Sequence, residues 1–192
     1  VMDTHNLLRR HRAVGKVSAL DAAHDGAPLT GSTGVAHTRW ATHGAPTEAN
    51  AHPHLARDEV AIVHNGIIEN HESLRKRLTA DGYHFASETD TESVVNAIHA
   101  RFAAGDDLFV GVQNVLSELE GAYALGVIST REPGRLIAAR RGSPLVIGVG
   151  IGEHFIASDV AALLPVTRDF IYLEEGDVVD LTRDSLIIYD AN

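Results

Sequence analysis

Two polar segments in the first half of the chain carry residue types that could perform chemistry. The first, HTRWATHGAPTEANAHPH, runs from His37 to His54, and the second, VHNGIIEN, runs from Val63 to Asn70. The first segment follows neither a helical nor a strand period, so packing in a core explains it poorly. A third segment, SETDTE (residues 87–92), adds carboxylates and hydroxyls just before an apolar helical pattern. One such segment alone could be a polar surface loop, but the three together indicate a binding site.

Two charged residues in these segments suit the two charged groups of an amino acid. Arg39 offers a planar fork of donors that matches a carboxylate, and Asp90 offers an acceptor for an ammonium group. Thr42 and His43 are close enough to Arg39 in the sequence to add hydrogen bonds to the same carboxylate. Taken singly, Arg39 could form a structural salt bridge and Asp90 could cap its helix. Together they predict a site for the α-carbon end of an amino acid.

The Asn65-Gly66 pair suits a negative charge that develops on an oxygen atom. The amide of Asn65 can donate a hydrogen bond, and Gly66 lets a backbone N–H approach a ligand without an intervening Cβ. An oxyanion hole needs donors of this kind. The alternative is a hairpin turn, the commonest meaning of Asn-Gly between apolar runs. Against it, Ile67 and Ile68 lead within two positions to a predicted helix cap at Asn70.

Histidines raise a metal site as a competing hypothesis. The relevant side chains are His37, His43, His52, His54 and His64. Their spacing matches no HExxH or related motif, and Pro53 forces an extended loop rather than one ligand face, so we predict no metal and no other cofactor. Stoichiometric transition metal in the purified protein would favour the metal hypothesis, and elemental analysis that finds none would exclude it. A Ser-His-Asp hydrolase is weakly supported because no Gly-X-Ser-X-Gly sequence occurs.

Short regular elements must position these motifs. Apolar runs predict strands at residues 34–39 and 59–65, each with a polar motif at its carboxyl end. Helices are predicted at 18–25, 70–80, 108–119 and 159–164, with a further helix from a capping box at Thr89 and Glu92 to about Gly105. The seven strands predicted after residue 121 are AYALGVIS, RLIAAR, PLVIGVG, HFIAS, FIYLEEG, DVVDL and SLIIY. This pattern predicts an α+β fold with antiparallel sheets and helices packed outside them.

Composition bounds the size and the partners. A chain of 192 residues, 44% of them hydrophobic, predicts one domain, residues 1–192. A formal charge of −10 argues against a nucleic-acid partner, and the densest basic group (Arg9, Arg10 and Arg12) is interpreted as a solvated strand edge. Neither a membrane span nor a signal peptide is recognised, so we expect a cytoplasmic protein with no membrane partner. Cysteine is absent, which excludes disulfides and removes the strongest nucleophile available near neutral pH.

The ordered motifs resemble one enzyme family over essentially the whole chain. They are HTRWATHG, NAHPH, VHNGIIEN, SETDTE, GSPLVIG, FIASD and LEEGD. They are similar to the glutaminase (class II glutamine amidotransferase) domain of the glutamine-fructose-6-phosphate aminotransferases. The resemblance implies an N-terminal nucleophile (Ntn) hydrolase fold, an αββα sandwich of two antiparallel sheets between helical layers. It also implies L-glutamine as the substrate, sugar-isomerase domains as partners in the parent chain, and a parent that is a homo-oligomer.

The resemblance also implies a role for each polar residue. It assigns the α-carboxylate of glutamine to Arg39, Thr42 and His43, and the α-ammonium group to Asp90. By the same motifs, the oxyanion belongs to Asn65 and Gly66. Trp40 belongs to the wall between the glutaminase site and the synthase half, where ammonia must pass.

One departure from the family decides the expected activity. The family's nucleophile is an N-terminal cysteine whose own α-amino group acts as the base, and this sequence, which begins at Val1, has neither the cysteine nor the strand and helix around it. We therefore expect a piece of the glutaminase domain, without the sugar-isomerase domains after Asn192, that is inactive alone. Its parent would move the amide nitrogen of glutamine onto fructose 6-phosphate. The alternative is a non-catalytic amino-acid-binding module that has lost the nucleophile.

Overall fold

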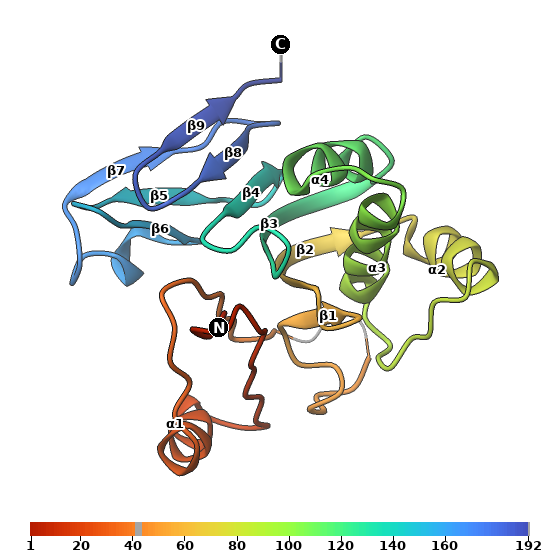
Figure 1. Cartoon of the computed structure of the whole chain (residues 1–192), viewed down its shortest axis with the longest axis horizontal. Helices are drawn as coiled ribbons and strands as arrows, with labels where there is room; N and C mark the ends of the chain where they lie inside the picture. Colours follow the sequence, from red (N-terminus) through yellow and green to blue (C-terminus); the bar gives the residue numbers. More distant parts are fainter. Residues whose placement is uncertain (41–43, 192) are drawn as a thin grey trace.

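The structure, a computed structural model, describes residues 1–40 and 44–191. In this part of the chain, helices and two sheets form separate layers (Figure 1). The helices are α1 (Val17–Gly26), α2 (His71–Ala80), α3 (Asp90–Ala103), α4 (Leu108–Leu116) and the one-turn 3-10 helix η1 (Val160–Ala162). No helix among the described residues is long and apolar enough to cross a lipid bilayer.

Both sheets are antiparallel throughout. The larger sheet has the order β1-β2-β3-β4-β8-β9, and the smaller one has the order β6-β5-β7. The larger sheet comprises β1 (His54–Ala56), β2 (Val60–Ile68), β3 (Gly121–Ser129), β4 (Leu136–Arg141), β8 (Val178–Leu181) and β9 (Leu186–Tyr189). The smaller sheet comprises β5 (Val146–Val149), β6 (His154–Ala157) and β7 (Asp169–Tyr172). The longest ladder joins β2 to β3 over nine residue pairs, so these strands form the centre of the fold.

Two apolar cores hold the layers together. The larger lies between the six-stranded sheet and helices α2, α3 and α4, and it includes Ile62, Leu78 and Ile98. The smaller lies where the other face of that sheet meets β5, and it includes Ala138 and Ile147. Figure 1 shows the corresponding separation, with α2, α3 and α4 on one side and β5, β6 and β7 on the other. Burial of both sheet faces explains the continuous apolar runs in the central strands.

Two short helical segments lie on the side of the smaller sheet. Val17 and Leu20 of α1 line a cavity of about 610 Å³ that also borders Phe155 and Ile156 of β6. On β5, a Cβ added to Gly148 would lie next to the side chain of Leu163, which follows η1. Two antiparallel sheets with helices outside them confirm the predicted α+β class.

Most elements match the sequence patterns that predicted them. Helix 70–80 is observed as α2, the seven strands after residue 121 are all present, and residues 159–164 contain η1. The side chain of Thr89 accepts a hydrogen bond from the backbone N–H of Glu92, as a capping box requires. The carboxylate of Glu92, however, accepts from the backbone N–H groups of Ala86 and Ser87 instead of reaching back to Thr89. The capping box is therefore only half formed.

Two predictions about strands were wrong. Residues 34–39 are not a strand, although their Val-rich sequence predicts one. A strand needs the backbone of a neighbour to bond, and among the described residues this segment forms no ladder; it borders the 610 Å³ cavity instead. The second error concerns β2, which continues to Ile68, so Asn65 lies within the strand rather than at its end.

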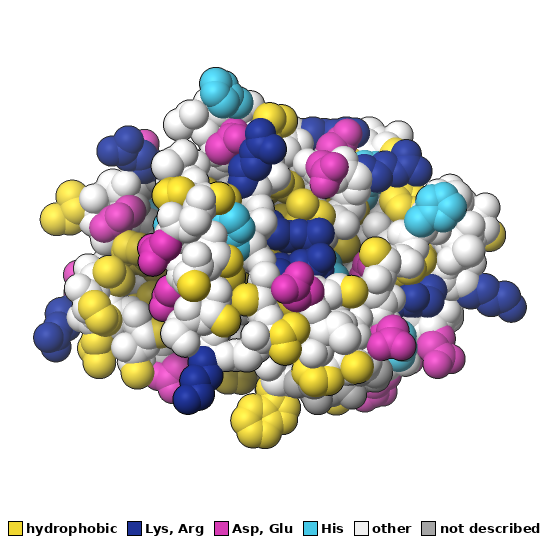
Figure 2. All heavy atoms as spheres, turned by 90° about the horizontal axis from the view of Figure 1, so that it is seen from below, with side chains coloured by type: hydrophobic (Ala, Val, Ile, Leu, Met, Phe, Trp, Pro, Cys, Tyr) yellow, Lys and Arg dark blue, Asp and Glu magenta, His cyan; other side chains and the backbone are white. Residues whose placement is uncertain are grey.

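The surface carries charges of both signs. Figure 2 shows the molecule from below, where acidic and basic side chains are interspersed with hydrophobic ones. The acidic excess of the sequence, 26 Asp and Glu against 16 Lys and Arg, is thus not gathered into one patch on this face.

Replacement of Asp107 by Ala should lower the free energy of unfolding by about 1 kcal/mol. The Asp107 side chain caps α4 by accepting a hydrogen bond from the backbone N–H of Val110 at 2.9 Å, and alanine leaves that donor without this partner. Urea unfolding of the two proteins measures the difference. Asp107→Ser retains a capping oxygen and should lose much less, and equal losses in both variants would contradict the capping role.

Candidate functional site

Residues from four parts of the chain surround one cavity of about 280 Å³. They come from the segment before residue 41, from His52, from β2 and from the start of α3. The cavity is lined by His37, Thr38, Arg39, Trp40, His52, His64, Asn65, Gly66, Ile67, Thr89, Asp90 and Thr91. A cavity of this size and polar lining suits a small metabolite.

The guanidinium group of Arg39 borders this cavity and is half-buried. Its Nη1 donates to the carbonyl oxygen of Ala45 at 3.0 Å, and its Nη2 donates to that of Gly44 at 3.1 Å. At least two of the five guanidinium N–H donors are therefore committed to the loop that follows, which restricts the plane of the group. Both of these partners are backbone carbonyls.

Asp90 is the first residue of α3, and its side chain is buried, with 4% of the residue exposed. Its Oδ2 accepts from the backbone N–H of Ile68 at 2.8 Å, and its Oδ1 accepts from that of Thr91 at 2.9 Å. The N-cap of α3 is Thr89, so the view of Asp90 as a simple helix cap is wrong. Asp90 instead ties α3 to β2. The Thr91 hydroxyl lies a further 3.4 Å from Oδ1, and His64 Nδ1 lies 4.0 Å from Oδ2. The helix N-terminus favours the negative charge.

Asn65 and Gly66 lie side by side in β2, paired with Ala124 and Tyr123 of β3. The straight ladder excludes a hairpin turn at this dipeptide. Gly66 has a φ of +126°, and a Cβ at this position would lie 2.1 Å from the carbonyl oxygen of Ala122. Only glycine fits there, because any side chain would be strained and would collide with the neighbouring strand.

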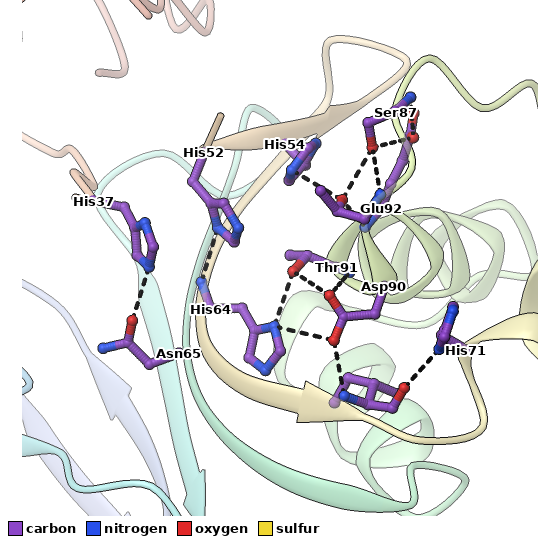
Figure 3. Close-up of polar contacts among 12 residues, drawn as sticks. His37, His52, His54, His64, Asn65, His71, Ser87, Asp90, Thr91 and Glu92 are labelled. Atoms are coloured by element: carbon purple, nitrogen blue, oxygen red, sulfur yellow. Dashed lines mark hydrogen bonds and ion pairs between the residues drawn. The ribbon is translucent and has the colours of Figure 1, made fainter. Parts of the chain in front are cut away.

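His37 contacts the side-chain amide of Asn65. Its Nε2 lies 2.8 Å from Asn65 Oδ1, and Figure 3 shows the imidazole directed at the amide oxygen. A neutral His37 that carries its proton on Nε2 donates to this oxygen, which turns the amide NH₂ group of Asn65 away from His37. Burial lowers the pKa of His37, which favours the neutral ring. The sequence motifs contain His37, but their spacing gave no sign of this contact.

Three histidines of the cavity lining, His37, His52 and His64, contact one another and the start of α3. The ring of His37 stacks on His52 with centroids 4.2 Å apart, and His52 Nδ1 accepts from the backbone N–H of His64 at 3.3 Å. The His64 ring in turn contacts Thr91 Oγ1 at 2.9 Å (Figure 3). In the described part of the chain, no three His, Cys, Asp or Glu side chains converge as metal ligands do. The rings act here as packing and hydrogen-bonding groups.

The buried histidines should make stability depend on pH. Burial, followed by the charges of Arg12 and Arg10, lowers the pKa of His54 from 6.5 to about 3. Below pH 6.5 the unfolded chain binds a proton at this position and the folded chain does not, so the free energy of unfolding falls as the pH falls towards 3. The slope for one such group is at most about 1.4 kcal/mol per pH unit. The full contribution is present above pH 6.5.

Denaturant unfolding between pH 7 and 5 measures this effect, because few carboxylates titrate in that range. His54→Gln should reduce the slope, since glutamine cannot gain the proton but can still bond Thr89, whose Oγ1 lies 3.1 Å from His54 Nε2. The same exchange at His84, which is exposed, is the control for loss of one imidazole. An unchanged slope in His54→Gln would contradict the prediction.

The structure brings together four of the residues that the sequence singled out. Arg39, Asn65, Gly66 and Asp90 all line the 280 Å³ cavity, and their roles remain predictions. Trp40 also borders the cavity but is 91% exposed, so it lies at the rim. The two remaining predicted residues, Thr42 and His43, lie outside the described residues.

The interpretation of the basic group near the N-terminus as a solvated strand edge is wrong for two of its members. Arg10 Nη1 donates to the carbonyl oxygen of Pro53 at 3.0 Å. Arg12 Nη1 donates to those of Ala49 and Ala51 at 3.1 and 3.2 Å. Both guanidinium groups therefore hold residues 49–53, the last part of the polar segment 37–54. These contacts join residues about 40 positions apart, so local sequence patterns could not predict them.

Comparison with known proteins identifies the family. Residues 37–165 match the model of a family described as a glutamine amidotransferase domain. The chain is 56% identical over 191 residues to a glutamine–fructose-6-phosphate aminotransferase (isomerizing) of Pseudomonas aeruginosa, and 58% identical over 191 residues to the protein of that name from Idiomarina loihiensis. Each alignment covers 100% of this chain and 31% of the relative. The chain thus spans about a third of the length of these relatives.

Solved structures agree with this assignment. A glutamine phosphoribosylpyrophosphate amidotransferase from B. subtilis superposes with a TM-score of 0.66 at 25% identity, over 80% of this chain and 34% of that one. An allosteric regulatory enzyme of purine biosynthesis superposes with a TM-score of 0.67 at 27% identity, with the same coverage. The predicted Ntn-type fold is confirmed by these matches, and so is the resemblance inferred from the motifs. The chain belongs to the glutamine amidotransferase domain family.

Proposed function

We propose that this chain is a glutamine-binding domain, the glutaminase part of an enzyme that transfers the amide nitrogen of glutamine to fructose 6-phosphate. The observation that carries the proposal is the shared cavity. Arg39 and Asp90 line it together with Asn65 and Gly66, so one small ligand can meet all four. The relatives described above, which are glutamine–fructose-6-phosphate aminotransferases by name, support the choice of substrate.

The chemistry of the four residues matches the three functional groups of L-glutamine. Arg39 binds the α-carboxylate through charge-assisted hydrogen bonds, and Asp90 binds the α-ammonium group. The side-chain amide of glutamine then reaches the Asn65-Gly66 part of the cavity. There the Asn65 NH₂ group and the Gly66 backbone N–H stabilise the negative charge that forms on the amide oxygen during attack by a nucleophile.

Hydrolysis by the mechanism of this family needs a cysteine nucleophile. The 192 residues contain no cysteine, so we expect them to bind glutamine without consuming it. In a protein that carries this domain behind an N-terminal cysteine, the thiolate would attack the amide carbon and ammonia would leave. Water would then hydrolyse the thioester and release glutamate. The exposure of Trp40 at the rim of the cavity supports the proposal that this side chain contacts the domain that receives the ammonia.

Calorimetric titration of the chain with L-glutamine tests the proposal. Saturable binding with one site per chain is expected. N-acetyl-L-glutamine, which lacks the ammonium group, and L-glutamine α-amide, which lacks the carboxylate, should both bind much more weakly. No heat with millimolar L-glutamine, or equal affinity for all three ligands, would overturn the assignment of Arg39 and Asp90.

A second candidate function is a non-catalytic amino-acid-binding module that uses the same cavity. Both functions predict binding, so a different measurement is needed to separate them. The coding sequence upstream of Val1 provides it. An in-frame Met-Cys-Gly start would support the glutaminase, and a start codon or another domain there would support the binding module.

A further inference from the structure

The carboxylate-binding arginine depends on a loop for its position. Arg39 donates to the carbonyl oxygens of Gly44 and Ala45, as described above. These two peptide units therefore help to hold the guanidinium group at the wall of the cavity. A group that fixes Gly44 and Ala45 also acts on the position of the cation.

Two side chains far apart in the sequence fix these peptide units. Asn50 Nδ2 donates to the carbonyl oxygen of Ala45 at 2.9 Å and to Glu88 Oε2 at 3.1 Å. The backbone N–H of Glu88 donates back to Asn50 Oδ1 at 2.9 Å, and the backbone N–H of Ala45 donates to Glu88 Oε2 at 3.4 Å. The peptide units around Ala45 are thus held through both a carbonyl and an N–H group. Asn50 is only 2% exposed, so water cannot readily replace these bonds.

Packing around Gly44 shows how closely the Glu88–Asn50 pair holds the loop. Gly44 has a φ of +74°, and a Cβ added there would lie 2.6 Å from Asn50 Nδ2 and 2.9 Å from the side chain of Glu88. The pair therefore touches the backbone itself, which rules out a loosely associated surface contact.

Glu88 also connects the loop to the other side of the cavity. It precedes Thr89, the N-cap of α3, and Asp90 follows directly. The Glu88–Asn50 pair consequently joins the loop that holds Arg39 to the segment that carries Asp90. This connection therefore contributes to the separation between the guanidinium and carboxylate groups.

We propose that Glu88 and Asn50 are positioning residues that set the spacing between Arg39 and Asp90, and thereby the affinity for the α-amino-acid end of the ligand. This inference rests on the proposed function, because it concerns the same cavity. Neither residue lines the 280 Å³ cavity. Both act through the loop and Arg39.

Binding measurements on the whole chain test the proposal. Glu88→Ala and Asn50→Ala should each raise the dissociation constant for L-glutamine about tenfold, while Glu88→Gln, which keeps an acceptor oxygen, should stay within about threefold. Glu48→Ala removes an exposed carboxylate from the same loop and is the matched control. The double variant Arg39→Ala/Glu88→Ala should bind no more weakly than Arg39→Ala alone, because Glu88 acts through Arg39.

Amide hydrogen exchange on the free chain provides a readout that needs no ligand. Glu88→Ala should speed exchange at Ala45 and its neighbours in the loop and leave the β2–β3 ladder unchanged. The inference would be overturned if the wild-type chain binds L-glutamine and Glu88→Ala binds it with the same affinity. An unchanged exchange rate at Ala45 in Glu88→Ala would also overturn it. Failure of the wild-type chain to bind L-glutamine would instead overturn the proposed function, so the two failures are distinguishable.

Discussion

Asn65→Ala is expected to lower glutamine turnover about 100-fold in a protein that carries this domain behind an N-terminal cysteine. The amide NH₂ group of Asn65 is one of two proposed donors to the oxyanion, and alanine removes it. The charge on the substrate oxygen grows as the nucleophile attacks, so the loss should fall on kcat. The KM for glutamine should change little. Steady-state glutamate release at several glutamine concentrations separates the two constants.

A second asparagine provides the control for this experiment. Asn70 lies just beyond the same strand, and its side-chain amide donates to the carbonyl oxygen of Glu118 at 2.7 Å, away from the cavity. Asn70→Ala should reduce stability but leave kcat near its original value. A change of less than threefold in kcat for Asn65→Ala would contradict the assignment of Asn65 to the oxyanion site.

His37 donates to the same amide, so His37→Ala should give a smaller loss, again in kcat.

Arg39→Ala should weaken glutamine binding by about 10-fold to 100-fold, because charge-assisted hydrogen bonds contribute about 1.5 to 3 kcal/mol each. The α-carboxylate keeps its charge throughout the reaction, so Arg39 binds the substrate and the transition state equally well. In a cysteine-containing parent, the KM should therefore rise while kcat changes far less. In the present chain, the dissociation constant measured by calorimetry should rise by the same factor.

Arg39→Lys separates the contribution of the two parallel guanidinium hydrogen bonds from the contribution of the positive charge. Lysine keeps the positive charge but cannot form two parallel bonds with a carboxylate, so its affinity should lie between those of the wild type and Arg39→Ala. L-glutamine α-amide has no carboxylate, and its weak binding should not change in either variant. An unaltered glutamine dependence in Arg39→Ala would refute the assignment.

Local patterns in the sequence predicted most elements of the fold. Helix α2 has Leu74 and Leu78 one turn apart, both buried, and α3 begins where Thr89 provides a cap. The strands after residue 121 are apolar runs separated by turn residues, which is sufficient to recognise them individually. Such signals depend only on neighbours in the sequence. For the same reason they do not reveal that β5, β6 and β7 leave the main sheet and form a second one.

Predictions that needed a partner elsewhere in the chain were less successful. Residues 34–39 have the composition of a strand but no ladder among the described residues. The site residues could be named because their chemistry is visible in their types, as for Arg39 and Asp90. Their supports could not, because His37 meets Asn65 across 28 positions and Asn50 meets Glu88 across 38. No periodicity encodes contacts of this range.

The two sides of the cavity are supported by different kinds of structure. Asn65 and Gly66 belong to the central ladder, whose amides become exposed to exchange only when the sheet itself opens. Arg39 is bonded instead to the carbonyl oxygens of Gly44 and Ala45, in a loop outside that sheet. Under the proposed roles, we expect ligand binding to rearrange mainly the side that would receive the carboxylate, because the side that would receive the reacting amide belongs to the central ladder.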